Sequence, residues 1–250
     1  MKPGVSAAIV TGCGQGIGLS CLQSMAQQEW NQFTFGVTRS RTSVLDECLS
    51  SIDSPVDIRY FDVSDGNLSD NFFSGIDDSI RIERVILNAG IRSRVVLEDA
   101  EMSLFSDVLS VNFLSQVKWA KACIGRAVRL DHRLSILAVS SIVGSRGFSG
   151  LTTYAASKSA LEGFVRSAAV EFATKNVQIN AIAPGFVESS YASDFRLNRP
   201  ELYRWTLDQT PMRRWGRCSE VAELASFLVS PANSYMTGSV IPCDGGWTAK

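Results

Sequence analysis

Thr11-Gly12-Cys13-Gly14-Gln15-Gly16-Ile17-Gly18 separates an apolar run from a helical pattern near the start of the chain. The run 7–10 shows no alternation, as expected of a strand that is covered on both faces of a parallel sheet. Glycines permit positive φ and a close backbone approach. Free N–H groups at a helix N-terminus attract phosphate. The stretch therefore predicts a strand, a glycine-rich turn and a helix that bind the phosphates of a nucleotide.

The glycine spacing alone is a weak signal. It reads G-x-x-x-G-x-G, not the G-x-G-x-x-G of the common dinucleotide fingerprint. An ordinary strand–helix turn would explain it equally well without the strand before it and the helical pattern after it.

Strand and helix patterns alternate along the whole chain. Strands are expected near 7–11, 33–38, 56–61, 84–88, 133–140, 177–183 and 239–243. Helices are expected near 16–28, 42–51, 66–79, 100–127, 153–174 and 218–229. Such alternation with short connections predicts a doubly wound, Rossmann-type α/β fold with a parallel seven-stranded sheet and helices on both faces. We expect residues 1–250 to form a single dinucleotide-binding catalytic domain.

Tyr154 and Lys158 lie one helical turn apart in the predicted helix 153–174, so their side chains share one face. A nearby ammonium stabilises tyrosinate, which predicts a lowered Tyr154 pKa. A phenol of this kind suits general acid–base chemistry on an alcohol or a carbonyl. The alternative is a surface Tyr and Lys, because this spacing is common by chance.

Two hydroxyls, Ser140 and Ser141, follow the apolar strand 134–139. They are expected at the carboxyl end of that strand, where open α/β sheets bind ligands. Their position supports a catalytic role for Tyr154.

With these motifs the chain resembles the short-chain dehydrogenase/reductase family over nearly its whole length. The matching motifs, in order, are 11–18, Asp62-Val63, Asn88-Ala89-Gly90, Asn112, Ser141, Tyr154 with Lys158, Pro184-Gly185 and Asp244-Gly245-Gly246. The thirteen-residue gap between Ser141 and Tyr154 is also typical of the family and favours Ser141 over Ser140.

The resemblance implies four catalytic residues. Tyr154 would exchange a proton with the substrate oxygen, which Ser141 would orient. Lys158 would bind the nicotinamide ribose, and Asn112 would hold a water that links Lys158 to solvent. Without the resemblance, we would interpret Asn112 as a structural polar residue in a helix.

The resemblance also implies the cofactor contacts. Asp62 and Val63 would contact adenine, and 88–90 the adenosine side. Pro184 to Val187 would contact nicotinamide, and Ser189 stands where the family often has Thr. The expected cofactor residues are Gly12, Gln15, Gly16, Ile17, Gly18, Arg39, Asp62, Val63, Asn88, Ala89, Gly90, Tyr154, Lys158, Pro184, Gly185, Val187 and Ser189.

The end of the second strand favours NADP(H) over NAD(H). NAD-binding chains carry a carboxylate there for the ribose 2′-hydroxyl, whereas this chain has Thr38 followed by Arg39. An arginine can pair with a 2′-phosphate. Gln15 stands where NADP-preferring relatives often have a second basic residue, and Arg39 and Arg41 could instead be solvated loop charges.

A substrate lid is expected over about 189–217. This segment holds six arginines and three acids, together with several aromatic residues. A cationic, aromatic lid would suit an acidic or sugar-like substrate, or an acyl group on a phosphorylated carrier. Arg92, Arg94 and Arg146 are expected at the same strand ends, with Arg146 as the candidate for a carboxylate or phosphate contact; all of these arginines could equally be solvated.

Composition gives no sign of a nucleic-acid or membrane partner. The net charge is −1, 45% of residues are hydrophobic, and no apolar run reaches transmembrane length. No metal site is expected, because the chain has one histidine, His132, and no C-x-x-C. We interpret His132 as a surface residue, and Cys13 and Cys21 as buried thiols. The composition and the absence of a signal sequence favour a cytoplasmic protein.

These features predict an oxidoreductase that interconverts a carbonyl and a secondary alcohol, with Tyr154 as general acid or base. Within the family the chain resembles 3-oxoacyl-carrier-protein reductases and sugar-acid or polyol dehydrogenases. An NAD-dependent sugar-acid or polyol dehydrogenase is the alternative enzyme, and a non-catalytic dinucleotide-binding sensor or scaffold is the alternative outside catalysis. A nucleotide-sugar epimerase or dehydratase is less consistent, because such relatives usually carry an added domain. The resemblance further implies a homodimer or homotetramer.

Overall fold

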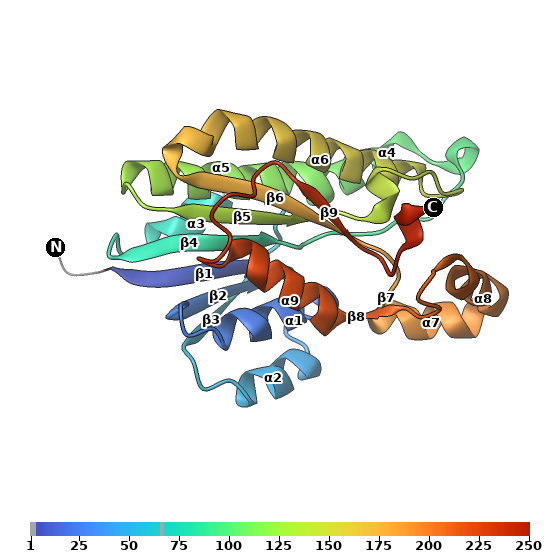
Figure 1. The fold of residues 1–250 in the computed structure, drawn as a ribbon, viewed down its shortest axis with the longest axis horizontal. Helices are drawn as coiled ribbons and strands as arrows, with labels where there is room; N and C mark the ends of the chain where they lie inside the picture. Colours follow the sequence, from blue (N-terminus) through green and yellow to red (C-terminus); the bar gives the residue numbers. More distant parts are fainter. Residues whose placement is uncertain (1–3, 66–67) are drawn as a thin grey trace.

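The computed structural model describes residues 4–65 and 68–250. A seven-stranded parallel sheet crosses the molecule, in the order β3-β2-β1-β4-β5-β6-β9 (Figure 1). Its strands are β1 (Val5–Thr11), β2 (Phe33–Thr38), β3 (Val56–Tyr60), β4 (Ile80–Leu87), β5 (Leu134–Val139), β6 (Val177–Pro184) and β9 (Val240–Cys243). The predicted doubly wound, seven-stranded fold is confirmed.

The strand order reverses between β1 and β4. The chain runs outward from β1 to β3 and then returns to place β4 on the other side of β1, with Ile9 opposite both Phe35 and Val85. At such a reversal the connections after the two neighbouring strands diverge and leave a crevice at the carboxyl ends. The glycine-rich turn lies at this position.

Helices cover both faces of the sheet. On one face lie α1, α2 and α9, and on the other α3, α5 and α6 (Figure 1). The helices are α1 (Gly16–Ala26), α2 (Ser43–Ser50), α3 (Leu68–Ser74), α4 (Met102–Leu109), α5 (Ser115–Arg129), α6 (Thr152–Phe172), α7 (Ser190–Asn198), α8 (Pro200–Gln209) and α9 (Cys218–Val229). Each face has its own apolar core, and Trp119 and Leu22 are among the fully buried members of the two cores.

Two predicted helices differ in detail. The one expected at 66–79 is resolved as α3, and residues 66–67 lie outside the described residues. The one expected at 100–127 is divided into α4 and α5 by a π-helical turn, Ser110–Leu114. Such wide turns gather at functional sites, and this one carries Asn112.

The segment expected as a lid forms a small structure of its own beyond the carboxyl ends of the strands. It contains α7 and α8, bracketed by the short strands β7 (Val187–Glu188) and β8 (Gly216–Arg217) (Figure 1). Ala192, Phe195 and Trp215 are its buried centre. Sequence reasoning treated this segment as a lid and predicted no helix in it; the structure shows α7 and α8, with the rings of Phe195, Tyr203 and Trp215 packed together.

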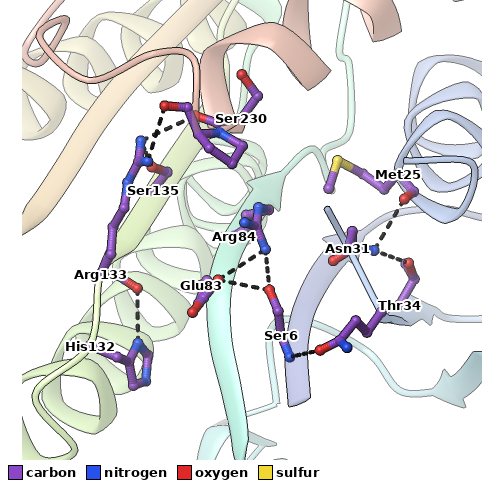
Figure 2. Close-up of polar contacts among 12 residues, drawn as sticks. Ser6, Met25, Asn31, Thr34, Glu83, Arg84, His132, Arg133, Ser135 and Ser230 are labelled. Carbon is purple, nitrogen blue, oxygen red and sulfur yellow. Dashed lines mark hydrogen bonds and ion pairs between the residues drawn. The ribbon is translucent and has the colours of Figure 1, made fainter. Parts of the chain in front are cut away.

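A buried polar network closes the opposite, amino-terminal end of the sheet (Figure 2). The Arg84 guanidinium lies against Ser6 and Glu83 and over the Trp30 ring, 4.5 Å from its centroid. Nearby, Arg133 donates to the carbonyl oxygen of Ser230, just beyond the end of α9. These contacts hold the starts of β1, β4 and β5 and the end of α9 together.

His132 belongs to this end of the molecule, and its interpretation as a surface residue is wrong. It is only 5% exposed, and its Nδ1 lies 2.9 Å from the carbonyl oxygen of Arg133 (Figure 2). The polar turn around it suggested exposure, but the imidazole forms this local hydrogen bond and turns inward.

The glycine-rich turn is held by contacts that leave no space for side chains. The Gly12 N–H donates to the Val37 carbonyl oxygen at 2.7 Å, and the Asn88 amide donates to the Gly12 carbonyl oxygen at 3.0 Å. A Cβ on Gly18 would lie 2.1 Å from that same carbonyl oxygen. Gly12 and Gly16 have φ of +67° and +60°, which explains two further glycines of the motif.

We expect Gly18→Ala to lower the free energy of unfolding by about 1–3 kcal/mol, because the added methyl group displaces the Gly12 carbonyl. Dinucleotide affinity should fall with it, since the same turn forms the crevice. Gly125→Ala is the matched control: nothing lies within 4 Å of its Cβ in α5. This change should be neutral or stabilising. Denaturant unfolding and fluorescence titration measure both effects; equal behaviour of the two variants would contradict the packing argument.

Candidate active site

A cavity of about 470 Å³ opens at the carboxyl ends of β1, β4, β5 and β6. Fifteen residues predicted from sequence as catalytic, cofactor or substrate residues line it. They are Gly12, Gln15, Gly16, Ile17, Asn88, Ala89, Gly90, Arg92, Ser141, Tyr154, Lys158, Pro184, Gly185, Val187 and Ser189. The structure therefore brings segments from across the chain to one crevice.

Ser141, Tyr154 and Lys158 lie together on this wall. Ser141 follows β5, while Tyr154 and Lys158 occupy successive turns of α6. The Ser141 side chain lies close enough to the Tyr154 phenol to lower its pKa. The Lys158 ammonium donates to the Val139 carbonyl oxygen at 2.8 Å and lies 5.7 Å from the centroid of the Tyr154 ring. A carbonyl oxygen placed beside the two hydroxyls would meet two donors.

Burial dominates the charge state of this group. It raises the pKa of Tyr154 above its ordinary value, although Arg92 and the Ser141 hydrogen bond partly oppose the shift. The expected fall in the Tyr154 pKa is therefore wrong for this structure, because removal of the phenol from water outweighs nearby positive charge. Burial also lowers the pKa of Lys158 to about 8, and Glu162 partly offsets that effect. The phenol is thus protonated at neutral pH and able to donate.

Asn112 lies behind the cavity and is fully buried. Its amide oxygen accepts from the Ile91 N–H at 2.7 Å, and its amide nitrogen donates to the Ile91 carbonyl at 2.9 Å and to Ser157 at 3.0 Å. A Cβ on Gly90 would lie 3.2 Å from the Asn112 amide oxygen and 3.7 Å from the Lys158 nitrogen. The π-helical turn thus holds the loop after β4 next to Lys158.

The crevice has the features that a dinucleotide requires. The start of α1 faces it, and no side chain of the first turn of that helix is acidic. Gly12 and Gly16 keep the backbone close to the opening, where a Cβ on Gly12 would lie 2.7 Å from the Cα of Ala89. Gly18 does not line the cavity and instead packs beneath the turn. The residues present therefore fit a pyrophosphate at the α1 N-terminus.

Three predicted cofactor residues lie outside the cavity, after β2 and β3. Arg39 is exposed, and its charge contributes to a lowered pKa of Asp62, whose main cause is hydrogen bonding from Ser64. Val63 is half-buried against the apolar core of the α5 face. Of the two arginines after β2, Arg41 forms an ion pair with Asp46 at 2.9 Å, whereas no ion pair of Arg39 is found among the described residues.

Of the three predicted substrate arginines, only Arg92 lines the cavity. Arg94 donates to the Ser149 carbonyl oxygen, and Arg146 donates to the Thr248 carbonyl oxygen at 2.9 Å. Arg94 and Arg146 do not line this cavity, so a substrate contact at either residue stays a prediction. The loops that carry them still reach the cavity through Ile91 and Phe148.

Most of the charge expected of the lid is neutralised. Arg196 pairs with Glu188, Arg213 with Asp208, and Arg214 with Glu220. Glu188 and Glu220 lie just outside 189–217, so counting charges within that segment overstated its positive character.

The cavity wall has an aromatic part, of which sequence reasoning missed Phe148. Phe148, Phe186 and Trp215 line it, with 5.3 Å between the ring centroids of Phe186 and Trp215. Phe186 belongs to the segment 184–187 that was expected to contact nicotinamide, and Trp215 belongs to the predicted lid.

Glu162 was also missed. It is 6% exposed, lies one turn beyond Lys158 on α6, and accepts a 2.7 Å hydrogen bond from Ser140. A Cβ on Gly144 would lie 2.2 Å from its carboxylate oxygen, so the loop after β5 closes tightly over it. The spacing of four residues from Lys158 was visible in the sequence and indicates the pairing.

The fold and the site define a nucleotide-binding α/β oxidoreductase, and comparison with known proteins agrees. A family model described as enoyl-(acyl carrier protein) reductase matches residues 12–248. The chain is 32% identical to 3-oxoacyl-[acyl-carrier-protein] reductase of Chlamydia pneumoniae over 241 residues, 96% of each chain. It is 31% identical to galactitol 2-dehydrogenase (L-tagatose-forming) of Cereibacter sphaeroides, over 96% of this chain and 94% of the relative.

A solved structure gives the same result. A protein of Beutenbergia cavernae assigned as an NAD(P)-dependent gluconate 5-dehydrogenase, with NADP bound at low occupancy, has a TM-score of 0.89 and 27% identity over 98% of this chain and 97% of that one. The chain belongs to the short-chain dehydrogenase/reductase family. It is an NAD(P)-dependent oxidoreductase that acts on CH–OH or carbonyl groups. No helix of the described residues is both long and apolar enough to cross a bilayer.

Glu162→Gln should move the alkaline limb of the pH profile for ketone reduction to lower pH by about one unit. The carboxylate raises the pKa of Lys158 against burial, so its removal lets Lys158 lose its proton earlier. Ser140→Ala is the control, because it removes the hydrogen bond and keeps the charge. Superimposable profiles of kcat/KM against pH for Glu162→Gln and wild type would contradict this role.

Proposed function

We propose that this protein is a carbonyl reductase that favours NADPH and uses Tyr154 as its general acid. The observation that carries the proposal is the grouping of Ser141, Tyr154 and Lys158 on the wall of a cavity that also contains the glycine-rich turn. When bound, the nicotinamide supplies the hydride.

Each residue has a role that follows from its position. The hydroxyls of Ser141 and Tyr154 bind the substrate oxygen, and Tyr154 gives it a proton as the alcohol forms. A phenol whose pKa is raised by burial retains that proton at neutral pH. Lys158 holds positive charge beside the phenol, and Asn112 fixes the loop through Ile91. The predicted cofactor residues around the cavity hold the dinucleotide.

The preference for NADPH rests on the end of β2. Thr38 is buried there, and its hydroxyl lies 2.6 Å from the position of a Cβ on Gly14. The next residue, Arg39, is exposed. With a dinucleotide bound at the glycine-rich turn, the Arg39 guanidinium would contact the ribose 2′-phosphate. No carboxylate side chain occurs between 33 and 41.

Two substrate classes fit the site, and the relatives include both. A 3-oxoacyl group or a sugar acid would place its carbonyl at Tyr154, and Arg92, which influences the Tyr154 pKa, would lie near the reacting end. The aromatic wall of Phe148, Phe186 and Trp215 favours a substrate with an apolar portion, which ranks the oxoacyl class first. An NAD-dependent oxidation of a sugar acid or polyol is the second candidate.

We also infer a cytoplasmic homodimer or homotetramer. The inference rests on the resemblance to the family, and α5 and α6 each carry an exposed valine, Val128 at 44% and Val170 at 83%.

Tyr154→Phe should lower kcat for ketone reduction by at least about 100-fold, because general acid catalysis contributes on this scale. Affinity for the dinucleotide should change little, since the ring is retained. Stopped-flow reduction and fluorescence titration separate the two. Turnover that survives the change would refute the assigned acid; a wild type that binds dinucleotide but reduces no carbonyl would favour a sensor or scaffold.

Arg39→Ala should weaken NADPH binding by roughly tenfold or more, the value of a charge-assisted hydrogen bond to phosphate. NADH binding should not change, because NADH has no 2′-phosphate. Arg41→Ala is the matched control, since Arg41 is paired with Asp46. Tighter binding of NADH than of NADPH by the wild type would contradict the proposed preference for NADPH.

A further inference from the structure

A second hollow of about 370 Å³ lies outside the catalytic cavity. Three segments far apart in the sequence surround it: the loop after the Ile142–Gly144 turn, the helix α8 and the last residues of the chain. Its principal lining residues are Arg146, Phe148, Trp205, Gln209, Trp247 and Lys250. We refer to it as the outer pocket.

The outer pocket adjoins the catalytic cavity through shared aromatic residues. Phe148 lines both. The Trp247 ring centroid lies 5.9 Å from that of Phe148, and 5.1 Å from that of Phe186, which lines the catalytic cavity. A chain that extends from the reacting carbonyl along Phe148 would therefore enter the outer pocket.

Two cationic side chains, Arg146 and Lys250, line this pocket. Arg146 donates to the Thr248 carbonyl oxygen, and Lys250 to the Gln209 side chain at 3.2 Å. Among the side chains that the structure describes, neither cation has a carboxylate within ion-pair distance, and no acidic residue lines the pocket. The lid arginines Arg196, Arg213 and Arg214 are all paired.

The pocket's apolar surface is exposed as well. Trp205 is 44% exposed, with its ring centroid 5.4 Å from that of Trp247. A guanidinium beside open indole rings suits a ligand with an apolar stem and an anionic oxygen head. A simple sugar or polyol would use neither feature fully.

We propose that the outer pocket binds the remote anionic group, a carboxylate or a phosphate, of an elongated substrate whose carbonyl lies at Tyr154. This inference rests on the proposed carbonyl reduction and specifies its substrate class. Arg146 is then a specificity residue that touches the far end of the substrate and takes no part in proton transfer.

The test compares methyl ketones that carry a terminal carboxylate, CH3CO(CH2)nCOO⁻ with n from 2 to 8, with their methyl esters and with phosphates of equal length. For wild type, kcat/KM should favour the anions once the chain reaches the outer pocket. Arg146→Ala should raise KM of those anions roughly tenfold with little change in kcat, and should leave the esters unaffected. Arg146→Lys should recover part of the loss.

Arg204→Ala is the matched control, because it removes the same charge from α8 at a residue that does not line the pocket. An unchanged ratio of anion to ester in Arg146→Ala, at every chain length and with both head groups, would overturn the proposal. A preference confined to carboxylates or to phosphates would identify the head group.

A binding measurement keeps this test separate from the proposed reaction. Titration with decanoate and decyl phosphate, followed by tryptophan fluorescence, should saturate in wild type and weaken roughly tenfold in Arg146→Ala. If no ketone is reduced, the proposed function fails while this titration still decides the pocket. If neither anion gives a saturable response in wild type, the pocket proposal is wrong even when neutral ketones are reduced.

Discussion

The close approach of the glycine-rich turn to the end of β4 is the constraint on which the rest of the site depends. At Gly12 three parts of the chain meet: its N–H is held by β2, its carbonyl by the Asn88 amide, and its α-carbon faces Ala89. No side chain larger than hydrogen fits between them. This contact fixes the start of α1 over the sheet and determines the floor of the cavity. The loops after β4 and β5 then build the catalytic wall on that floor.

The catalytic wall is organised around a buried cation. Lys158 is removed from water, held by a backbone carbonyl and accompanied by one buried carboxylate, Glu162. Removing a charge from water is costly unless hydrogen bonds and an opposite charge compensate it. Glu162 therefore matters to the site although it does not line the cavity, and Ser140, which does line it, donates a hydrogen bond to Glu162. The same low polarity keeps the Tyr154 phenol protonated.

The parts of the fold that were predictable from sequence are those with local periodicity. Apolar runs such as 7–10 and 134–139 identified the buried strands, and the spacing of Tyr154 and Lys158 identified one face of α6. What the sequence did not reveal depends on contacts between distant segments. Three examples are the pairing of Arg214 with Glu220, the burial of His132 and the contact of Arg146 with Thr248, which arise from three-dimensional neighbours that no local pattern encodes. The raised pKa of Tyr154 could not be predicted from local sequence either, because the burial that raises it is a property of the assembled site.

The region between β7 and β8 carries its own apolar centre, around Phe195 and Trp215, and its own ion pairs. The chain enters it after Pro184 and leaves into α9, and the region also contacts the residues after β9, where the Met212 N–H donates to the Gly245 carbonyl oxygen. Apart from Val187, Ser189 and Trp215, which line the catalytic cavity, such a unit can change its sequence without disturbing the site for the dinucleotide. Substrate specificity in this architecture can therefore change during evolution through this region, while the residues that carry out hydride transfer stay the same.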